Sequence, residues 1–203
     1  TLTGFRKMGA LAKTGCYPFD IEREGFVLGE GGALMVLESL ETAIARGAQI
    51  YAHVLGTGIT NDSHHMSSFD PSYRKGKKAE ELCLKRSGWQ AAAVDAVHAH
   101  GTSTPQNDQM EANLISQLLR PHTWVMASKG ATSHTLVAAG AVTIALGLLS
   151  LKQQALLPCV GLKQSAFDLN FARQGQSKRL HKLLCFSFGF GGQNAVLALE
   201  ALG

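Results

Sequence analysis

Short apolar runs along the chain are separated by polar clusters, and their spacing predicts alternating strands and helices. The runs at residues 94–99 and 124–127 have the length of buried strands. Each run is followed by a helical pattern, at residues 108–119 and at the uncharged residues 135–151. Strands that alternate with helices are typical of α/β domains with parallel strands. The pattern therefore predicts an α/β fold.

The remaining segments fit the same α/β pattern. Residues 183–188 and 195–200 carry alternating apolar side chains on both sides of a glycine-rich centre, which predicts a β-hairpin. Gly47 and Gly88 stand where two helical patterns stop. The other expected elements are two strand segments around a glycine cluster at 26–38, a helix at 40–46, a strand at 48–57, a polar loop at 59–73 and a helix at 77–86. No domain boundary interrupts the pattern, so residues 1–203 are expected to form one domain.

Composition narrows the classes of protein to which this chain can belong. Of its 203 residues, 45% are hydrophobic and 17% are charged, which suits a folded core rather than a disordered chain. The net charge is +4, but no basic stripe with interleaved aromatic residues is present, so nucleic-acid binding is not expected. Four widely spaced cysteines without a CxxC pair are expected to be reduced packing residues: Cys16, Cys83, Cys159 and Cys185.

The uncharged stretch at residues 135–151 is the candidate for a membrane span. It is shorter than the ~20 residues that cross a bilayer, and much of it is Ala, Gly, Thr and Ser, which gain little in hydrocarbon. A helix that is apolar on all sides also suits the space between two layers of a soluble protein. We therefore predict a buried helix and no membrane span.

Polar clusters follow the two short strands and contain the candidate catalytic residues. His100 follows the first strand, and Lys129 and His134 follow the second. Because ligands in open α/β sheets lie beyond the carboxyl ends of strands, we expect both histidines near one site. Two ring N–H groups aimed at one point can stabilise a developing enolate oxygen.

Spacing alone leaves a structural interpretation open for each of these residues. A histidine in such a turn can satisfy or cap the backbone, and Lys129 can be a surface lysine. Thr102 and Thr104 can hydrogen-bond the amides of a ligand, or cap the helix that carries Asp108.

Two glycine-rich segments and a histidine pair complete the candidates. The GEGG segment at residues 29–32 lacks a βαβ unit, so no dinucleotide site is predicted. No metal site is predicted either, because His64 and His65 lack a spaced third ligand. The hairpin centre is either an ordinary bend or a movable wall beside a ligand, and it consists of Gly189, Phe190, Gly191 and Gly192.

Four motifs in a fixed order carry a resemblance to a known family. They are PFD, Arg23 and GEG within residues 18–31, HGTSTPQND at 100–108, SKGATSH at 128–134 and SFGFGGQN at 187–194. Together they cover nearly the whole chain. The sequence resembles the elongating β-ketoacyl-[acyl-carrier-protein] synthases of the fatty-acid and polyketide type.

This resemblance implies a fold and a chemistry. The family has a thiolase-like fold, in which two α/β halves stack as αβαβα layers, and this chain corresponds to the C-terminal half. The implied enzyme is an acyltransferase that performs a decarboxylative Claisen condensation between an acyl chain on a cysteine and malonyl on acyl carrier protein. By resemblance, His100 and His134 promote decarboxylation and stabilise the enolate, while Lys129 organises the site.

The resemblance also implies roles for residues that hold substrate or shape the site. Thr102 and Thr104 are similar to threonines that hold the phosphopantetheine arm. Phe190 is similar to the phenylalanine of a gating loop, and Asp108 to the structural acid of its motif. The glycines expected near the site are Gly189, Gly191 and Gly192.

The chain departs from the family pattern in three ways. The nucleophilic cysteine of the family lies upstream of the PFD motif, and none of the four cysteines replaces it. We therefore expect the chain to be inactive without a cysteine-bearing N-terminal half, on the same or a separate polypeptide, and its start at Thr1 favours excision from something longer. Thr143 and Ser133 stand where the family usually has Glu and Gly.

The resemblance implies partners as well. The carrier protein is acidic, which would suit a basic surface, and the densest basic run is Arg74, Lys75, Lys77 and Lys78. The complete enzyme is expected to be a homodimer in the cytoplasm, or in a plastid where one exists. No metal or redox cofactor is implied, because the phosphopantetheine arm arrives on the carrier protein.

Two other functions remain open beside the synthase. A noncatalytic partner of the chain-length-factor type would keep the fold without the nucleophile, but it would not need His100, Lys129 and His134 together. A hydrolase that uses His134 with a serine would need a GxSxG elbow, which the sequence lacks.

Overall fold

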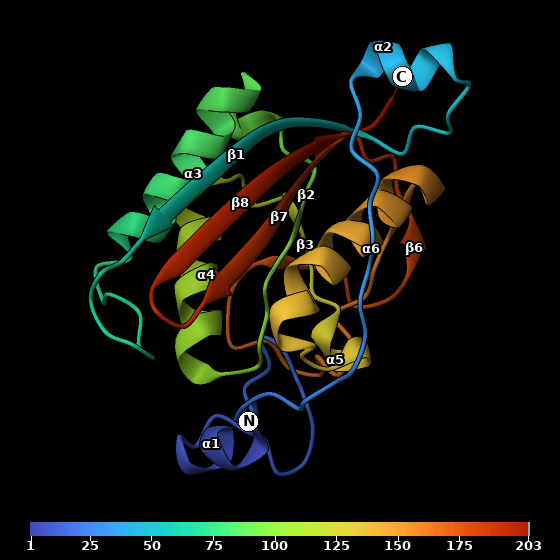
Figure 1. Ribbon diagram of the computed structural model, residues 1–203. Coiled ribbons are helices and arrows are strands. Elements are labelled where there is room, and N and C mark those ends of the chain that lie inside the picture. Colours follow the sequence, from blue (N-terminus) through green and yellow to red (C-terminus); the bar gives the residue numbers. More distant parts are fainter. Residues whose placement is uncertain (203) are drawn as a thin grey trace.

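A six-stranded mixed sheet forms the centre of the computed structural model, which describes residues 1–202 (Figure 1). The first three strands in spatial order are antiparallel neighbours, and the others run parallel to the third. In spatial order the strands are β1 (His53–Asn61), β8 (Gln193–Glu200), β7 (Lys182–Gly189), β2 (Ala96–His98), β3 (Trp124–Met126) and β5 (Asn170–Phe171).

Helices cover both faces of this sheet because the strand residues alternate between two apolar clusters. Leu184 and Phe186 of β7 pack with α3 (Arg74–Ser87) and α4 (Pro105–Leu118). Leu183 and Cys185 point to the opposite face, which is covered by α6 (Ala139–Gln153) (Figure 1). The predicted α/β architecture is confirmed as three layers, helix, sheet and helix.

Most predicted elements occur close to their expected positions. The hairpin is formed by β7 and β8, and α3 ends at Gly88, whose φ of +70° lies in the left-handed region that favours glycine. Helix α2 (Leu40–Ala45) begins after Ser39, whose hydroxyl accepts a hydrogen bond from the N–H of Thr42. β1 lies several residues later than predicted, since its pairing with β8 sets its ends.

The predicted strand segments at 26–38 are not strands. Phe26 and Leu28 make isolated bridges to Leu11 and His134, and residues 29–39 have no regular structure. A strand needs a hydrogen-bonding neighbour along its length, and the pairing here ends where the N–H of Gly29 donates to the carbonyl of His134, with no strand or bridge assigned at residues 30–39. Its apolar side chains are consequently exposed, and they are Leu34, Val36 and Leu37.

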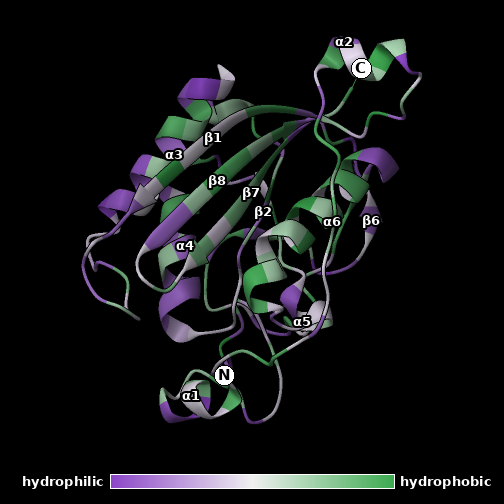
Figure 2. Ribbon diagram, in the orientation of Figure 1, coloured by the Kyte–Doolittle hydropathy of each residue, from purple (hydrophilic) through white to green (hydrophobic). Residues whose placement is uncertain are grey.

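The expectation that α6 is buried on all sides is wrong for this chain. Only one face of the helix is buried, because a single sheet packs against it. Figure 2 shows apolar residues along α6 and along the extended segment beside it. By length and composition the helix segment Leu136–Gln153 could cross a membrane, and 28% of that stretch is buried in the structure. The buried residues of α6 are Ala139, Thr143, Gly147, Ser150 and Leu151.

The remaining elements are short. A two-stranded antiparallel sheet joins β4 (Ala155–Leu156) to β6 (Gln176–Ser177). The other helical segments are α1 (Leu2–Lys7), α5 (Lys129–Thr132) and the 3₁₀ turns η1 (Ala91–Ala93) and η2 (Leu136–Ala138). All four cysteines are buried and free, as predicted.

Candidate active site

The turns that follow β2 and β3 bring both predicted histidines together. β2 and β3 are parallel neighbours, and the N–H of Ala99 continues their pairing by donating to the carbonyl of Met126. The ring centroids of His100 and His134 lie 5.3 Å apart with an interplanar angle of 83°. The two rings therefore contact each other edge to face beyond the carboxyl ends of these strands, where the positions of the polar clusters predict a common site.

Lys129 lies against His100 in the protein interior. Its Nζ is 3.3 Å from Nδ1 of His100 and also donates to the main-chain carbonyl of His100. Burial lowers the pKa of Lys129 to about 8, while the carboxylates of Glu111 and Asp108 act in the opposite direction. The surface interpretation of Lys129 is wrong, because its side chain is buried.

Both histidines are held in the neutral form with the same ring nitrogen free to donate. Nδ1 of His134 accepts a hydrogen bond from the N–H of Leu136 at 3.0 Å. Nδ1 of His100 faces the ammonium of Lys129, which can only donate. Burial and the charge of Lys129 lower the pKa of His134 to about 4 and that of His100 well below its usual value. Each neutral ring therefore carries its proton on Nε2.

The two threonines contact each other at the entry to α4. Their hydroxyl oxygens lie 2.8 Å apart, and Oγ1 of Thr104 accepts a hydrogen bond from the N–H of Asn107. Thr104 is therefore a helix cap, as one of its two interpretations predicts. The hydroxyl of Thr102 faces that of Thr104 two residues after His100, and Thr102 is buried whereas Thr104 is half-buried.

Asp108 has a structural role in the observed geometry. It is fully buried and accepts hydrogen bonds from the N–H groups of Phe19 at 2.8 Å and Ser103 at 3.1 Å. The guanidinium of Arg23 lies 3.9 Å away. Burial raises the pKa of Asp108 to about 6, against these hydrogen bonds. Asp108 thus ties the N-terminal segment to the turn after β2.

Glu111 is a buried residue beside the turn of His100 that the sequence analysis did not single out. Its carboxylate is fully buried and accepts hydrogen bonds from the N–H groups of His100 and Gly101, both at 2.6 Å. Asn107 adds a third donor at 2.7 Å. A signal was present, because Asn107 and Glu111 are four residues apart in the helix and share a face with the buried Asp108.

The turn of the hairpin reaches the site only at its base. The ring of Phe188 lies 6.3 Å from that of His100, whereas Phe190 is 45% exposed and its ring lies 6.1 Å from Phe5. Gly191 and Gly192 have φ values of +82° and +77°, which explains the glycines at these positions. Gly189 ends β7 opposite Gln193.

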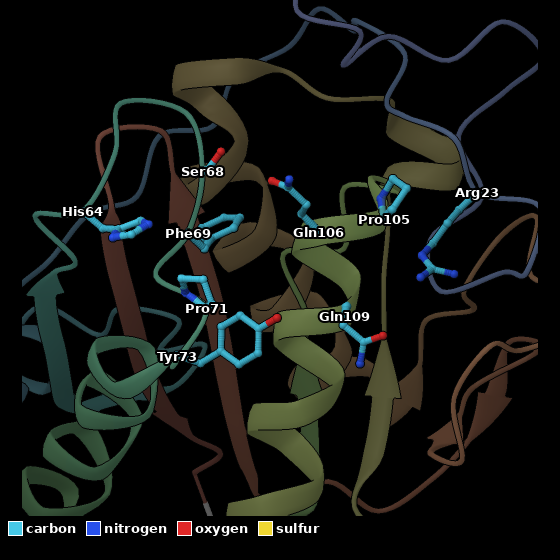
Figure 3. A pocket seen from close by; sticks show the side chains of 9 residues that line it. All are labelled: Arg23, His64, Ser68, Phe69, Pro71, Tyr73, Pro105, Gln106 and Gln109. Atoms are coloured by element: carbon cyan, nitrogen blue, oxygen red, sulfur yellow. The ribbon is translucent and has the colours of Figure 1, made fainter.

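A cavity of about 480 Å³ opens beside the start of α4 (Figure 3). It lies between the loop that precedes α3 and the first turns of α4, with Tyr73 and Pro71 on one side and Gln106 and Gln109 on the other (Figure 3). His100, Lys129 and His134 do not line it. Within residues 1–202, no three His, Cys, Asp or Glu side chains converge as a metal ion would require.

The arrangement can stabilise negative charge on an oxygen atom. Two neutral imidazoles lie in contact with their Nε2–H groups not engaged by the contacts at Nδ1, and a buried ammonium contacts Nδ1 of His100. Fixed donors in a water-poor site stabilise a developing oxyanion without reorganising during the reaction.

Two family models match the chain, and one of them covers His100, Lys129 and His134. Residues 51–163 match the model described as "Beta-ketoacyl synthase, C-terminal domain", and residues 1–43 match "Beta-ketoacyl synthase, N-terminal domain". A 3-oxoacyl-[acyl-carrier-protein] synthase 2 from Synechocystis is 37% identical over 190 residues, which cover 90% of this chain and 45% of that protein. The chain thus spans about half the length of the curated relatives it matches.

Solved structures show the same fold. A type II polyketide synthase ketosynthase in complex with its acyl-carrier protein matches all of this chain and 53% of its own, with 30% identity and a TM-score of 0.93. The ishigamide ketosynthase/chain length factor matches 99% of this chain and 50% of its own, with 30% identity and a TM-score of 0.93. These matches confirm the predicted thiolase-like fold.

Proposed function

Because the chain belongs to the β-ketoacyl synthase family, we propose that it supplies the histidine side of the active site of a 3-oxoacyl-[acyl-carrier-protein] synthase. The reaction is a decarboxylative Claisen condensation of malonyl-carrier protein with an acyl-enzyme. The observation that carries this proposal is the pair of neutral imidazoles, His100 and His134, with Lys129 in contact with His100.

The proposed step uses the ring protons without removing them. The bond between the malonyl carboxylate and its α-carbon breaks, carbon dioxide leaves, and the electron pair moves onto the thioester oxygen. The Nε2–H groups of His100 and His134 donate to this enolate oxygen. The α-carbon then attacks the acyl thioester, a carbon–carbon bond forms and the enzyme thiolate leaves.

The thiolate must come from another part of the complete protein. Burial raises the pKa of Cys16 to about 11 and those of Cys83, Cys159 and Cys185 to about 12. Thiols with such values are poor nucleophiles at neutral pH. We therefore propose that a cysteine-bearing N-terminal half completes the site and that residues 1–203 alone do not turn over.

The remaining roles concern the carrier protein. In this proposal, Thr102 and Thr104 hold the phosphopantetheine arm, and the exposed Phe190 gates its entry. The arm arrives on acyl carrier protein, so no separate cofactor is needed. The complete enzyme acts as a homodimer in the cytoplasm, or in a plastid where one exists, and the four free cysteines of this chain would stay reduced there.

Malonyl decarboxylation by the complete synthase tests the proposal. We expect His100→Gln and His134→Gln each to reduce it at least about a hundred-fold, because each removes a donor to the enolate. His181→Gln changes a histidine far from the site in the fold and serves as the control. Unchanged decarboxylation in both site variants would favour the alternative function, in which this chain is a noncatalytic partner of the chain-length-factor type. The similarity to the ishigamide ketosynthase/chain length factor supports that alternative.

A further inference from the structure

His98 is a buried titratable side chain that the proposed chemistry does not use. It ends β2, two residues before His100, and is fully shielded from solvent. Its Nε2 lies 3.1 Å from Oγ of Ser128, while its Nδ1 is buried without a hydrogen-bond partner. Burying an unpartnered polar atom costs free energy, so a histidine at this position calls for a physical reason.

The hydroxyl of Ser128 is turned away from its own helix. Ser128 immediately precedes α5, at a position where a serine side chain usually accepts a hydrogen bond from the helix. Here the side chain makes no such bond and instead contacts His98. The next residue, Lys129, contacts His100. Ser128 and Lys129 are consecutive residues. Ser128 contacts His98, the last residue of β2, and Lys129 contacts His100, two residues further along the chain.

The ring of His98 is neutral beside the ammonium. Burial and the charge of Lys129 lower the pKa of His98 to about 3, and the main chain of Thr143 acts in the opposite direction. A neutral ring can hold Ser128 without attracting or repelling the ammonium strongly. The charged or titratable groups that act on Lys129 from the other elements are Glu111 and Asp108 of α4 and Cys16 of the N-terminal segment.

We propose that His98 is a positioning residue for Lys129. Its neutral ring holds the hydroxyl of Ser128 and thereby fixes the first turn of α5, so that Nζ of Lys129 stays on Nδ1 of His100. Because that contact leaves the His100 proton on Nε2, the proposal rests on the function proposed above.

Ser128→Ala removes this link with the smallest change in side-chain volume. In the complete synthase we expect it to lower kcat for condensation about ten-fold and to leave KM for malonyl-carrier protein within about two-fold. His98→Leu should behave alike, whereas His98→Asn, whose amide can still bond Ser128, should keep about half of kcat. Ser150→Ala is the matched control, because Ser150 is equally buried and its Oγ faces Met126 instead.

A second readout does not depend on activity. In the same protein with ¹⁵N-labelled histidine, we expect the Nδ1 resonance of His100 to shift in Ser128→Ala and to stay in place in Ser150→Ala. An unchanged His100 resonance, or a kcat loss of equal size in Ser150→Ala, would overturn the positioning role. Absence of condensation in the unmodified protein would instead contradict the proposed function, while the resonance would still report on His98.

Discussion

Glu111 holds His100 by the main chain, because its Oε1 accepts a hydrogen bond from the N–H of His100 at 2.6 Å. Its other oxygen accepts from the N–H of Gly101 at 2.6 Å. Burial raises the pKa of Glu111 to about 7, although these hydrogen bonds favour the charged form. One carboxylate on α4 thus orients the turn that carries His100.

Glu111→Gln should destabilise the fold. The carboxylate accepts hydrogen bonds from the N–H groups of His100 and Gly101, and the amide N–H₂ of glutamine would face at least one of these donors with another donor. We expect the free energy of unfolding to fall by about 3 kcal/mol in urea titrations. Glu81→Gln on the outer side of α3, where Glu81 forms an ion pair with Lys78, should change it by less than about 1 kcal/mol. Equal stability of Glu111→Gln and the unmodified chain would refute this role.

Stability should fall in acid partly through His134. Its folded pKa is lowered to about 4, mainly by burial and then by Lys129. An unfolded histidine, with a pKa of about 6.5, therefore binds a proton that the folded one does not, and stability is lost as the pH falls from about 6.5 to about 4. In urea titrations across this range, His134→Gln should reduce the slope by about 1.4 kcal/mol per pH unit. The exposed variant His181→Gln should leave the slope unchanged, and parallel curves for both variants would contradict the assignment.

The rate of the complete synthase should fall in alkali through Lys129. Burial lowers the pKa of this ammonium to about 8, so its charge is lost as the pH rises through that value. We expect malonyl decarboxylation to show an alkaline limb near pH 8. Lys129→Met should be slower by about a hundred-fold and lack this limb, because it carries no titrating charge. If the alkaline limb of the pH profile persists at the same pH in Lys129→Met, the limb belongs to the titration of another group.

Glu80 is a further buried carboxyl group, and it makes no hydrogen bond within the part of the chain that the structure describes. Burial raises its pKa well above the usual value, with Glu81 adding to the effect. A raised folded pKa means that stability is lost as the pH rises above the unfolded value of about 4.3. Glu80→Met should therefore stabilise the chain by about 1–3 kcal/mol at pH 7, and by less at pH 4. Thermal unfolding at both pH values measures this, and a lower melting temperature for Glu80→Met at pH 7 would be the contrary result.

Ser133→Gly should stabilise the turn before His134. Ser133 has a φ of +57° with ψ of −173°, a conformation that glycine adopts without strain. Relief of that strain should raise the free energy of unfolding by about 1 kcal/mol. Ser87→Gly is the comparison, because Ser87 lies in the last turn of α3 and glycine there should cost about 1 kcal/mol. Urea titration of both variants measures the change in the free energy of unfolding. A loss of stability in Ser133→Gly would contradict the assigned strain.

The sequence by itself determined the order of elements and the location of the turns that carry His100, Lys129 and His134. The short apolar runs before His100 and Lys129 could become strands of a parallel sheet, and polar residues at their ends necessarily meet at one edge. The glycines after α2 and α3 marked their ends, because few other residues adopt a positive φ at little cost. These features are local in the chain, so periodicity and residue type are enough to predict them.

Only the tertiary structure decided which buried side chains support the site. The carboxylate of Glu111 and the ring of His98 contact atoms on neighbouring segments, and their sequence spacing alone does not reveal those contacts. The exposure of residues 29–39 and of the open face of α6 could not be predicted either. Their apolar patterns favour burial, but the packing of distant segments decides whether another surface covers them. Pairing and burial depend on which surfaces meet, and that is a non-local property of the folded chain.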